Sequence, residues 1–430
     1  MSIIIDKIAS YNLIKKGNLS FLFAFLTVFI LPIHVKYLPP LMIAWVICWI
    51  FEGHFRNNLI WSSKRVYNVL FFLFISYYIW QMIGLIYTSD VEMGLSNLFG
   101  RLSLILFPLV LLYPGDMIKN KTKILIRIFA LSTFLYMLFC FGYALYRSVS
   151  LQAGFWTFNP HPPEYFWLSY FYGSDLTVSQ HPSYISMYVI LSTFICFEAW
   201  FDYSLKLLNR IGWLIIGSLL LISQYYISSR AGILICMVLV PLYFIVKFKN
   251  LGKKRFAWLW IILVFIALVP LIVKNQRVDY LYGRVFNKQV GYERKRDPRI
   301  LIWESSLKIA RKNLLLGVGI GDVRTELTLE YEQIGEEKMA QERLNAHNQF
   351  LEVLLENGII GLTLFVTIFG VMIYIAFAEK NLLYGLFIII MLGFFMFETI
   401  LYRLAGVSFF SLFSFLLLHV NTQKNVDRGQ

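Results

Sequence analysis

The sequence predicts an all-α polytopic membrane protein with about twelve transmembrane helices and a long helical loop between the ninth and the tenth. Hydrophobic residues make up 58% of the 430 positions and charged residues only 15%, whereas soluble domains are about half apolar and a quarter charged. The mean hydropathy is +0.65. The apolar residues are gathered in successive runs, and a membrane helix needs about 20 of them. A single long polar insert interrupts this series.

The apolar runs define the expected spans. The first two are short and contain Pro32, Pro39 and Pro40, which favours a tight hairpin. The fourth run is also short. The predicted spans are 19–35, 38–52, 67–87, 97–113, 122–146, 183–201, 211–228, 230–247, 255–273, 359–378, 381–398 and 401–419.

Lysine and arginine crowd alternate short connections, and such connections face the cytoplasm. The connection at 88–96 carries Asp90 and Glu92 and no basic residue, so it is assigned to the opposite side. Both termini are therefore predicted to be cytoplasmic. Much of the net charge of +14 is this orientation signal, so no nucleic-acid partner is expected. The basic connections carry Arg56, Lys64 and Arg65; Lys119, Lys121 and Lys123; Lys206 and Arg210; and Lys247, Lys249, Lys253, Lys254 and Arg255.

Three regions follow from this layout. Residues 1–273 hold helices one to nine and an aromatic-rich outer loop at 147–182, residues 274–358 form the long outer loop, and residues 359–430 hold helices ten to twelve and a cytoplasmic tail. The aromatics of 147–182 suit an interfacial belt, and stacking on sugars is the alternative. No GxxxxGK[ST] phosphate loop occurs. The four cysteines lie scattered in apolar runs without metal-ligand spacing, so neither a metal nor a cofactor is expected.

The long loop is expected to be helical. Asp297 suits an N-cap, and Pro298 suits the first position of a helix. An apolar stripe on that helix is predicted from Ile300, Trp303, Leu307 and Ala310. The glycines of 317–322 are interpreted as a turn that allows close backbone approach, and residues 323–344 are charged and favour helix.

His347 is the candidate catalytic residue. Imidazole is the side chain best suited to move protons near neutral pH, and His347 lies where the loop re-enters the bilayer. Residues 347–357 are predicted to form a short helix or turn above the next span. Asn345, Asn348 and Gln349 flank the histidine with polar groups, and Asn348 is a secondary candidate. A purely structural histidine is the alternative.

Two arginines are candidates for binding an anionic group. Arg230 lies in a connection of almost no length between two apolar runs, where a cation is costly unless it is paired, solvated or functional. Arg299 opens the loop helix at the end where the helix dipole disfavours a cation. A guanidinium can bind phosphate with two parallel hydrogen bonds. The alternatives are snorkelling to lipid headgroups for Arg230 and a surface ion pair for Arg299. Weaker candidates are Arg101, Arg403 and His181.

Together these features resemble the O-antigen ligase and O-antigen polymerase superfamily. The resemblance rests on the layout of spans, on the Ser-Arg-Ala-Gly turn at 229–232, on Arg299 with the glycine turn, and on His347-Asn348-Gln349-Phe350-Leu351 with Glu356 and Gly358. It implies an O-antigen ligase, a metal-independent glycosyltransferase in the bacterial inner membrane. Such an enzyme moves a glycan from undecaprenyl diphosphate to a sugar hydroxyl of lipid A–core at the periplasmic face. His347 would then be the general base, and Arg230 and Arg299 would bind the diphosphate.

Three other functions remain open on the sequence. An O-antigen polymerase shares the donor chemistry and differs in its acceptor. A lipid-linked-oligosaccharide flippase would be expected to carry charged residues inside its spans, whereas the notable charges here lie at span ends and in one loop. A binding or scaffolding membrane protein would keep its function without His347.

Overall fold

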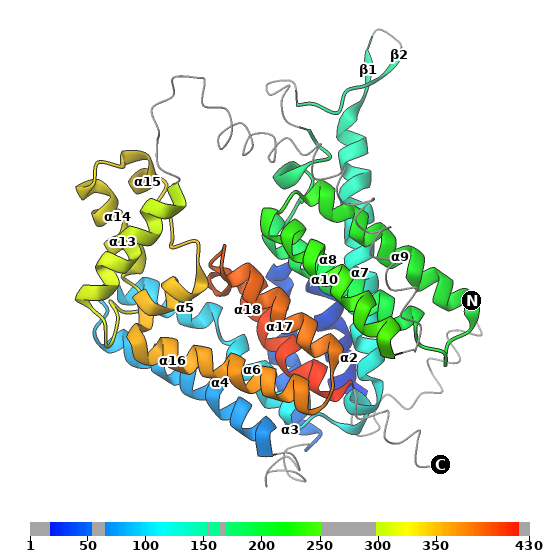
Figure 1. Cartoon of the computed structure of the whole chain (residues 1–430), viewed down its shortest axis with the longest axis horizontal. Coiled ribbons are helices and arrows are strands. Elements are labelled where there is room, and N and C mark those ends of the chain that lie inside the picture. Colours follow the sequence, from blue (N-terminus) through cyan, green and yellow to red (C-terminus); the bar gives the residue numbers. More distant parts are fainter. Residues whose placement is uncertain (1–17, 54–64, 153–154, 163–168, 251–297, 421–430) are drawn as a thin grey trace. The chain divides into compact units, whose positions relative to one another are not determined.

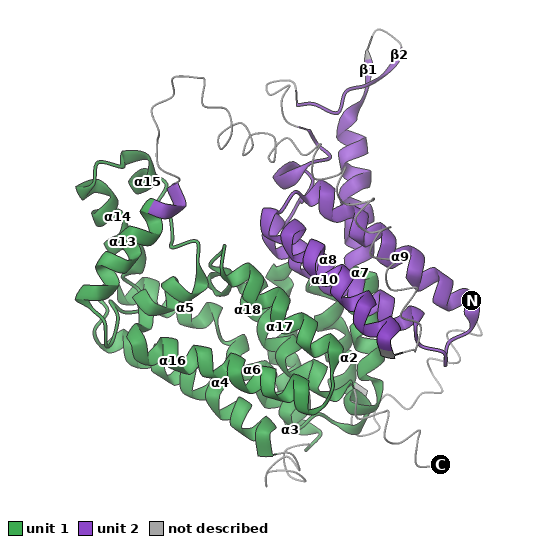
Figure 2. Ribbon diagram, viewed as in Figure 1, with its two compact units in different colours: residues 1–132, 301–430 green, residues 133–300 purple. Residues whose placement is uncertain are grey.

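The structure is a computed structural model that describes residues 18–53, 65–152, 155–162, 169–250 and 298–420. These residues are mostly helical, with one short two-stranded hairpin (Figure 1). They fall into two compact units (Figure 2): unit 1 combines residues 1–132 with 301–430, and unit 2 is residues 133–300.

The predicted spans that fall in the described residues are helical, and the predicted span 255–273 lies outside them. One of these spans differs from its prediction: 97–113 is not a single helix but is broken at Arg101 between two shorter helices, and the first of these already begins at Val91, inside the predicted connection 88–96. Among the described residues, seven helical segments are long and apolar enough to cross a membrane, and shorter apolar helices accompany them. The protein is therefore an all-α polytopic membrane protein. These helices are α2 (Asn18–Ile30), α3 (Leu38–Phe51), α4 (Arg65–Ile83), α5 (Val91–Gly100), α6 (Ser103–Leu112), α7 (Asp116–Ser148), α8 (Pro182–Trp200), α9 (Leu207–Ile227), α10 (Arg230–Asn250), α16 (Gln349–Ala378), α17 (Leu382–Phe395) and α18 (Leu404–Leu416).

Phenylalanine rings fill the core of the membrane helices of unit 1. Helix α4 packs against α6 and α16, and α18 packs against α6. The Phe410 ring of α18 lies 5.4 Å from Phe74 and 5.6 Å from Phe369. Such ring pairs add to the free energy gained by burying apolar surface. The short helices α2 and α3 pack on each other, as the predicted hairpin requires.

The loop helices of unit 1 are α13 (Pro298–Lys312), α14 (Val323–Gln333) and α15 (Glu337–Gln341). Pro298 and Arg299 are helical, as predicted, and the predicted N-cap Asp297 lies outside the described residues. From Leu301 onward, these helices enclose a small apolar core of their own, which also takes in Leu355 of α16. Its fully buried members are Ile302, Ile309, Ala310, Val323, Leu327, Tyr331, Met339, Ala340, Ala346 and Leu355.

The predicted apolar stripe of α13 is only partly right. Ile300 and Leu307 are exposed, whereas Ile302, Ser306 and Ile309 are buried. The Ser306 hydroxyl donates to the Ile302 carbonyl at 2.7 Å, so its polar group is satisfied inside the helix. A serine bonded in this way can face a core, and a pattern based on hydropathy alone does not detect it.

Unit 2 contains α7 from Thr133 onward, a short hairpin, and helices α8, α9 and α10. Helix α8 is buried along nearly its whole length and packs against α9 and α10. Strands β1 (Val149–Gln152) and β2 (Phe155–Phe158) pair antiparallel. The hairpin was not predicted. Its strands lie at the start of the aromatic-rich loop, and Phe155 and Trp156 are exposed.

Helix α16 is broken at Gly358, which separates a short first part from the apolar part that follows. Gly358 has φ 61° and ψ −166°, a conformation that is essentially restricted to glycine. A Cβ at this position would lie 2.2 Å from the Leu315 carbonyl oxygen. On either side, Ile359 N donates to Leu314 O at 2.8 Å and Val318 N donates to Leu355 O at 2.8 Å. The predicted short helix is therefore confirmed over 349–357, two residues later than expected, and backbone hydrogen bonds join it to the loop.

Replacing Gly358 with alanine should destabilise the protein. The positive φ alone costs roughly 1–3 kcal/mol in any other residue, and the Cβ would meet backbone that cannot move aside. We expect a lower apparent unfolding temperature in detergent. Gly370→Ala is the matched control in the same helix, because a Cβ at Gly370 meets nothing within 4 Å. Equal unfolding temperatures for the two variants would contradict the role assigned to Gly358.

Candidate functional site

The glycine turn at 317–322 attaches the loop helices to the segment between α4 and α5. The carboxylate of Asp322 accepts hydrogen bonds from Ser89 N at 2.6 Å and from Asp90 N at 2.8 Å. Gly321 N donates to the Thr88 hydroxyl at 3.0 Å, and a Cβ at Gly321 would lie 2.0 Å from the Asp90 carbonyl oxygen. The predicted close approach of backbone at this turn is confirmed.

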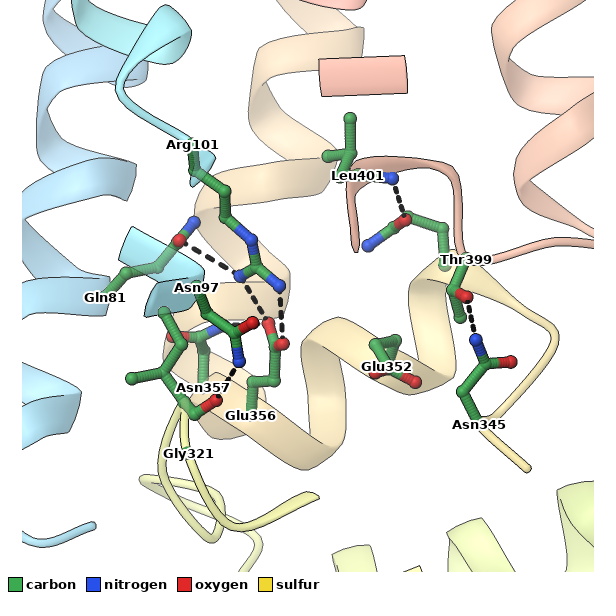
Figure 3. Close-up of polar contacts among 12 residues, drawn as sticks. Gln81, Asn97, Arg101, Gly321, Asn345, Glu352, Glu356, Asn357, Thr399 and Leu401 are labelled. Carbon is green, nitrogen blue, oxygen red and sulfur yellow. Dashed lines mark hydrogen bonds and ion pairs between the residues drawn. The ribbon is translucent and has the colours of Figure 1, made fainter. Parts of the chain in front are cut away.

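A buried ion pair lies beside this attachment. Arg101 occupies the break between α5 and α6, and its Nη1 and Nη2 donate to the two carboxylate oxygens of Glu356 at 2.7 and 2.6 Å (Figure 3). Gln81 Oε1 accepts a further bond from Nη1 at 3.1 Å. The Arg101 and Glu356 side chains are each 2% exposed. We interpret Arg101, a secondary candidate on sequence, as a residue that positions α16, because its terminal nitrogens already have partners.

His347 contacts Glu398 at the start of α16. His347 Nδ1 lies 3.3 Å from Glu398 Oε2, and the two side chains are 30% and 23% exposed. The backbone of His347 is left-handed, with φ 45°, and its N–H donates to the Asn345 side chain at 3.1 Å. With Nδ1–H donating to the carboxylate, the lone pair of Nε2 stays available to accept a proton.

The amides around His347 hold its segment against residues 396–401. Asn345 Nδ2 donates to the Thr399 hydroxyl at 2.6 Å, and Gln349 Oε1 accepts from Leu401 N at 2.7 Å (Figure 3). Asn348 is the N-cap of α16, since its Oδ1 accepts from Phe350 N at 2.9 Å and from Leu351 N at 3.1 Å. These side chains position the histidine through its neighbours.

Glu352 adds a second buried carboxylate one turn before Glu356. It is 1% exposed and accepts a hydrogen bond from Ala346 N at 3.2 Å. This bond ties the residue preceding His347 to the first turn of α16. Sequence reasoning named Glu356 within the motif but gave Glu352 no role.

The remaining predicted site residues all lie at helix ends. Arg230 is the first residue of α10 and is exposed, and Arg299 is the second residue of α13. His181 is the N-cap of α8, where its Nδ1 accepts from Ser183 N at 3.3 Å. Arg403 is the exposed N-cap of α18. Unit 1 thus holds His347, Asn348, Arg101 and Arg403, and unit 2 holds Arg230, Arg299 and His181.

A comparison with protein families matches a segment of the chain that contains most of the predicted site residues. Residues 215–366 match a family model described as O-antigen ligase. This match confirms the resemblance to the O-antigen ligase and polymerase superfamily. It includes Arg230, Arg299 and His347. A search of curated proteins found no match to this chain.

Glu398, like Glu352, is a site residue that sequence reasoning missed. It ends a predicted span, 381–398, in which it is the sole acidic residue. An ionisable side chain at a membrane helix end is itself a signal of function, so this position could have been selected for that reason. No local sequence motif could predict its contact with His347, because 51 residues separate the two in sequence.

The Arg101–Glu356 pair leads to a stability prediction. Arg101→Met should destabilise the protein by about 3–5 kcal/mol, because it leaves the Glu356 carboxylate buried without its partner. The double variant Arg101→Met, Glu356→Leu should recover most of that loss. Thermal unfolding in detergent measures both.

The exposed pair Lys338–Glu342, with side chains 86% and 52% exposed, supplies the control. Lys338→Met should change stability by less than about 1 kcal/mol. If the double variant at 101 and 356 loses as much stability as the two single variants added together, the two side chains do not stabilise the protein as a pair.

Proposed function

We propose that this protein is an O-antigen ligase. It would transfer a glycan from undecaprenyl diphosphate to a sugar hydroxyl of lipid A–core at the periplasmic face of the bacterial inner membrane. The observation that carries the proposal is the pair formed by His347 and Glu398, which is partly exposed beside the ends of two apolar helices, α16 and α17. The family match at 215–366 supports glycosyl transfer of the ligase or polymerase kind.

His347 is the general base in this proposal. Nε2 takes the proton of the acceptor hydroxyl as its oxygen attacks the anomeric carbon of the donor. The bond between that carbon and the diphosphate oxygen breaks, and the diphosphate leaves with the electron pair. A base within hydrogen-bond reach of the hydroxyl typically contributes about 10²–10⁴-fold in rate. Glu398 holds the ring in the tautomer that leaves Nε2 unprotonated and stabilises the imidazolium that forms.

Arg230 and Arg299 are proposed to bind the donor diphosphate. Charge develops on that group as it leaves, and fixed guanidinium groups stabilise such charge. Their planar donors match phosphate oxygens in pairs. Since arginine stays protonated at neutral pH, this binding needs no metal ion, as the resemblance implies.

The experiment that tests the proposal is transfer in vitro. Purified protein in lipid vesicles is given a lipid-linked glycan, with and without lipid A–core. A glycan joined to lipid A–core supports the ligase. Longer lipid-linked glycans, formed without lipid A–core, would identify a polymerase instead. The absence of both products from a folded, vesicle-inserted protein would overturn glycosyl transfer as the function.

Substitutions of His347 and Glu398 should distinguish the general base from the residue that orients it. His347→Ala should lower kcat by about 10²–10⁴-fold, and Glu398→Gln should lower it less, because the amide can still accept from Nδ1–H but carries no charge. Initial rates of glycan transfer give both values. His161→Ala, which alters an exposed histidine outside this site, is the control. Near-normal turnover of a folded His347→Ala protein would make the histidine a structural residue.

A further inference from the structure

Arg324 bridges a loop helix to the turn that precedes α18. It lies in the first turn of α14, and its guanidinium carbon is 4.5 Å from the centre of the Tyr402 ring. Stacking of this kind is favourable and holds the planar guanidinium in one orientation. The arginine is therefore presented in a fixed position.

Most of the hydrogen-bonding capacity of Arg324 is unused by the protein. A guanidinium has five N–H donors and no acceptor. Its Nη1 donates to the Arg343 carbonyl at 3.0 Å, and its Nε is enclosed without an acceptor. Among the residues that the structure describes, no carboxylate forms an ion pair with it, although the buried Glu352 carboxylate interacts with it electrostatically without such a contact. The positive charge is thus held in place and is not neutralised by an ion pair.

Two more arginines lie on the segments that Arg324 contacts. Arg403 follows Tyr402 directly and is exposed at the N-terminus of α18, and Arg343 is exposed beside the carbonyl that Arg324 binds. The N-terminus of α18 contributes partial positive charge as well. Clustering cations costs free energy, and a further anion bound among them lowers that cost, so the arrangement favours an anionic ligand.

This cluster belongs to the same unit as His347 and is tied to its segment. Asn345 donates to Thr399, and His347 contacts Glu398, so residues 343–347 are held against residues 398–403. Tyr402 and Arg403 stand where the membrane helix α18 begins. A phosphoryl group carried on a lipid lies at about that depth, since headgroups flank the hydrocarbon core.

We propose that Arg324 and Arg403 form a phosphoryl-binding subsite beside His347, with Tyr402 as the platform that orients Arg324. The ligand is a phosphoryl group carried by a membrane-anchored substrate, either the lipid diphosphate of the donor or a phosphate on the acceptor glycan. The identity of these substrates rests on the proposed function. The subsite is additional to Arg230 and Arg299, which lie in unit 2.

Binding measured without turnover tests the subsite. Purified protein in detergent is titrated with farnesyl diphosphate, a soluble lipid diphosphate, and separately with phosphorylated and dephosphorylated lipid A–core. Arg324→Gln should raise the Kd of one phosphorylated ligand by about 10- to 100-fold, as expected for loss of hydrogen bonds to a charged group. Arg311→Gln, an exposed arginine of α13 outside the cluster, should bind like the wild type.

The three ligands distinguish the two sources. A change with farnesyl diphosphate assigns the subsite to the donor. A change confined to phosphorylated lipid A–core, with the dephosphorylated form unaffected, assigns it to the acceptor. Unchanged affinity for every ligand overturns the subsite. An equal loss of affinity for phosphorylated and dephosphorylated lipid A–core also overturns it, because Arg324 would then only stabilise the fold.

Arg403→Gln is a second test that does not depend on whether the Arg324 variant folds. The Arg403 side chain is exposed, so this substitution is expected to leave the fold intact. It should raise the same Kd by about 3- to 10-fold, as expected for a weaker, exposed contact. Unchanged affinity in this folded variant also overturns the proposal. If the wild type makes no glycan product while phosphoryl binding still depends on Arg324, the proposed function fails and the subsite stands.

Discussion

The buried ion pair between Arg101 and Glu356 determines where the histidine segment lies. Two charges that are each 2% exposed persist in an apolar surrounding only when they meet with good geometry. Arg101 reaches Glu356 because the helix it belongs to breaks between α5 and α6, and α16 presents Glu356 in the turn just before Gly358. The pair therefore orients the first part of α16, and residues 345–349 follow from that orientation.

The other residues of the unit 1 site are held in place relative to the Arg101–Glu356 pair. Glu352, one turn before Glu356, accepts a hydrogen bond from Ala346 N, and Asn348 caps the helix. His347 is thus held between two fixed neighbours in a left-handed conformation, and its ring meets Glu398. A base held in this way loses little freedom when a substrate binds, which is how orientation contributes to rate.

Properties that depend on composition and local pattern were predicted from the sequence. The apolar runs predicted the helices, and the glycines of 317–322 predicted the close turn. The polar residues before Gly358 predicted the short helix, but His347 lies two residues before its first residue, Gln349, in a left-handed conformation. Properties that depend on distant pairing were not predicted. Arg101 and Glu356 lie 255 residues apart, and neither residue has a local signal that names the other. Glu398 was missed for the same reason. The buried Ser306 of α13 was missed because its hydroxyl is hydrogen-bonded within the helix.

Hydrogen exchange tests most directly whether the Arg101–Glu356 pair holds the site. Exchange rates report local opening, which is fastest where few interactions hold the backbone. In Arg101→Met, amide exchange should speed up in residues 314–322 and 343–358, while α8 and α9 of unit 2 should exchange as in the wild type. Unchanged exchange at 343–358, or an equal rise throughout both units, would contradict the account.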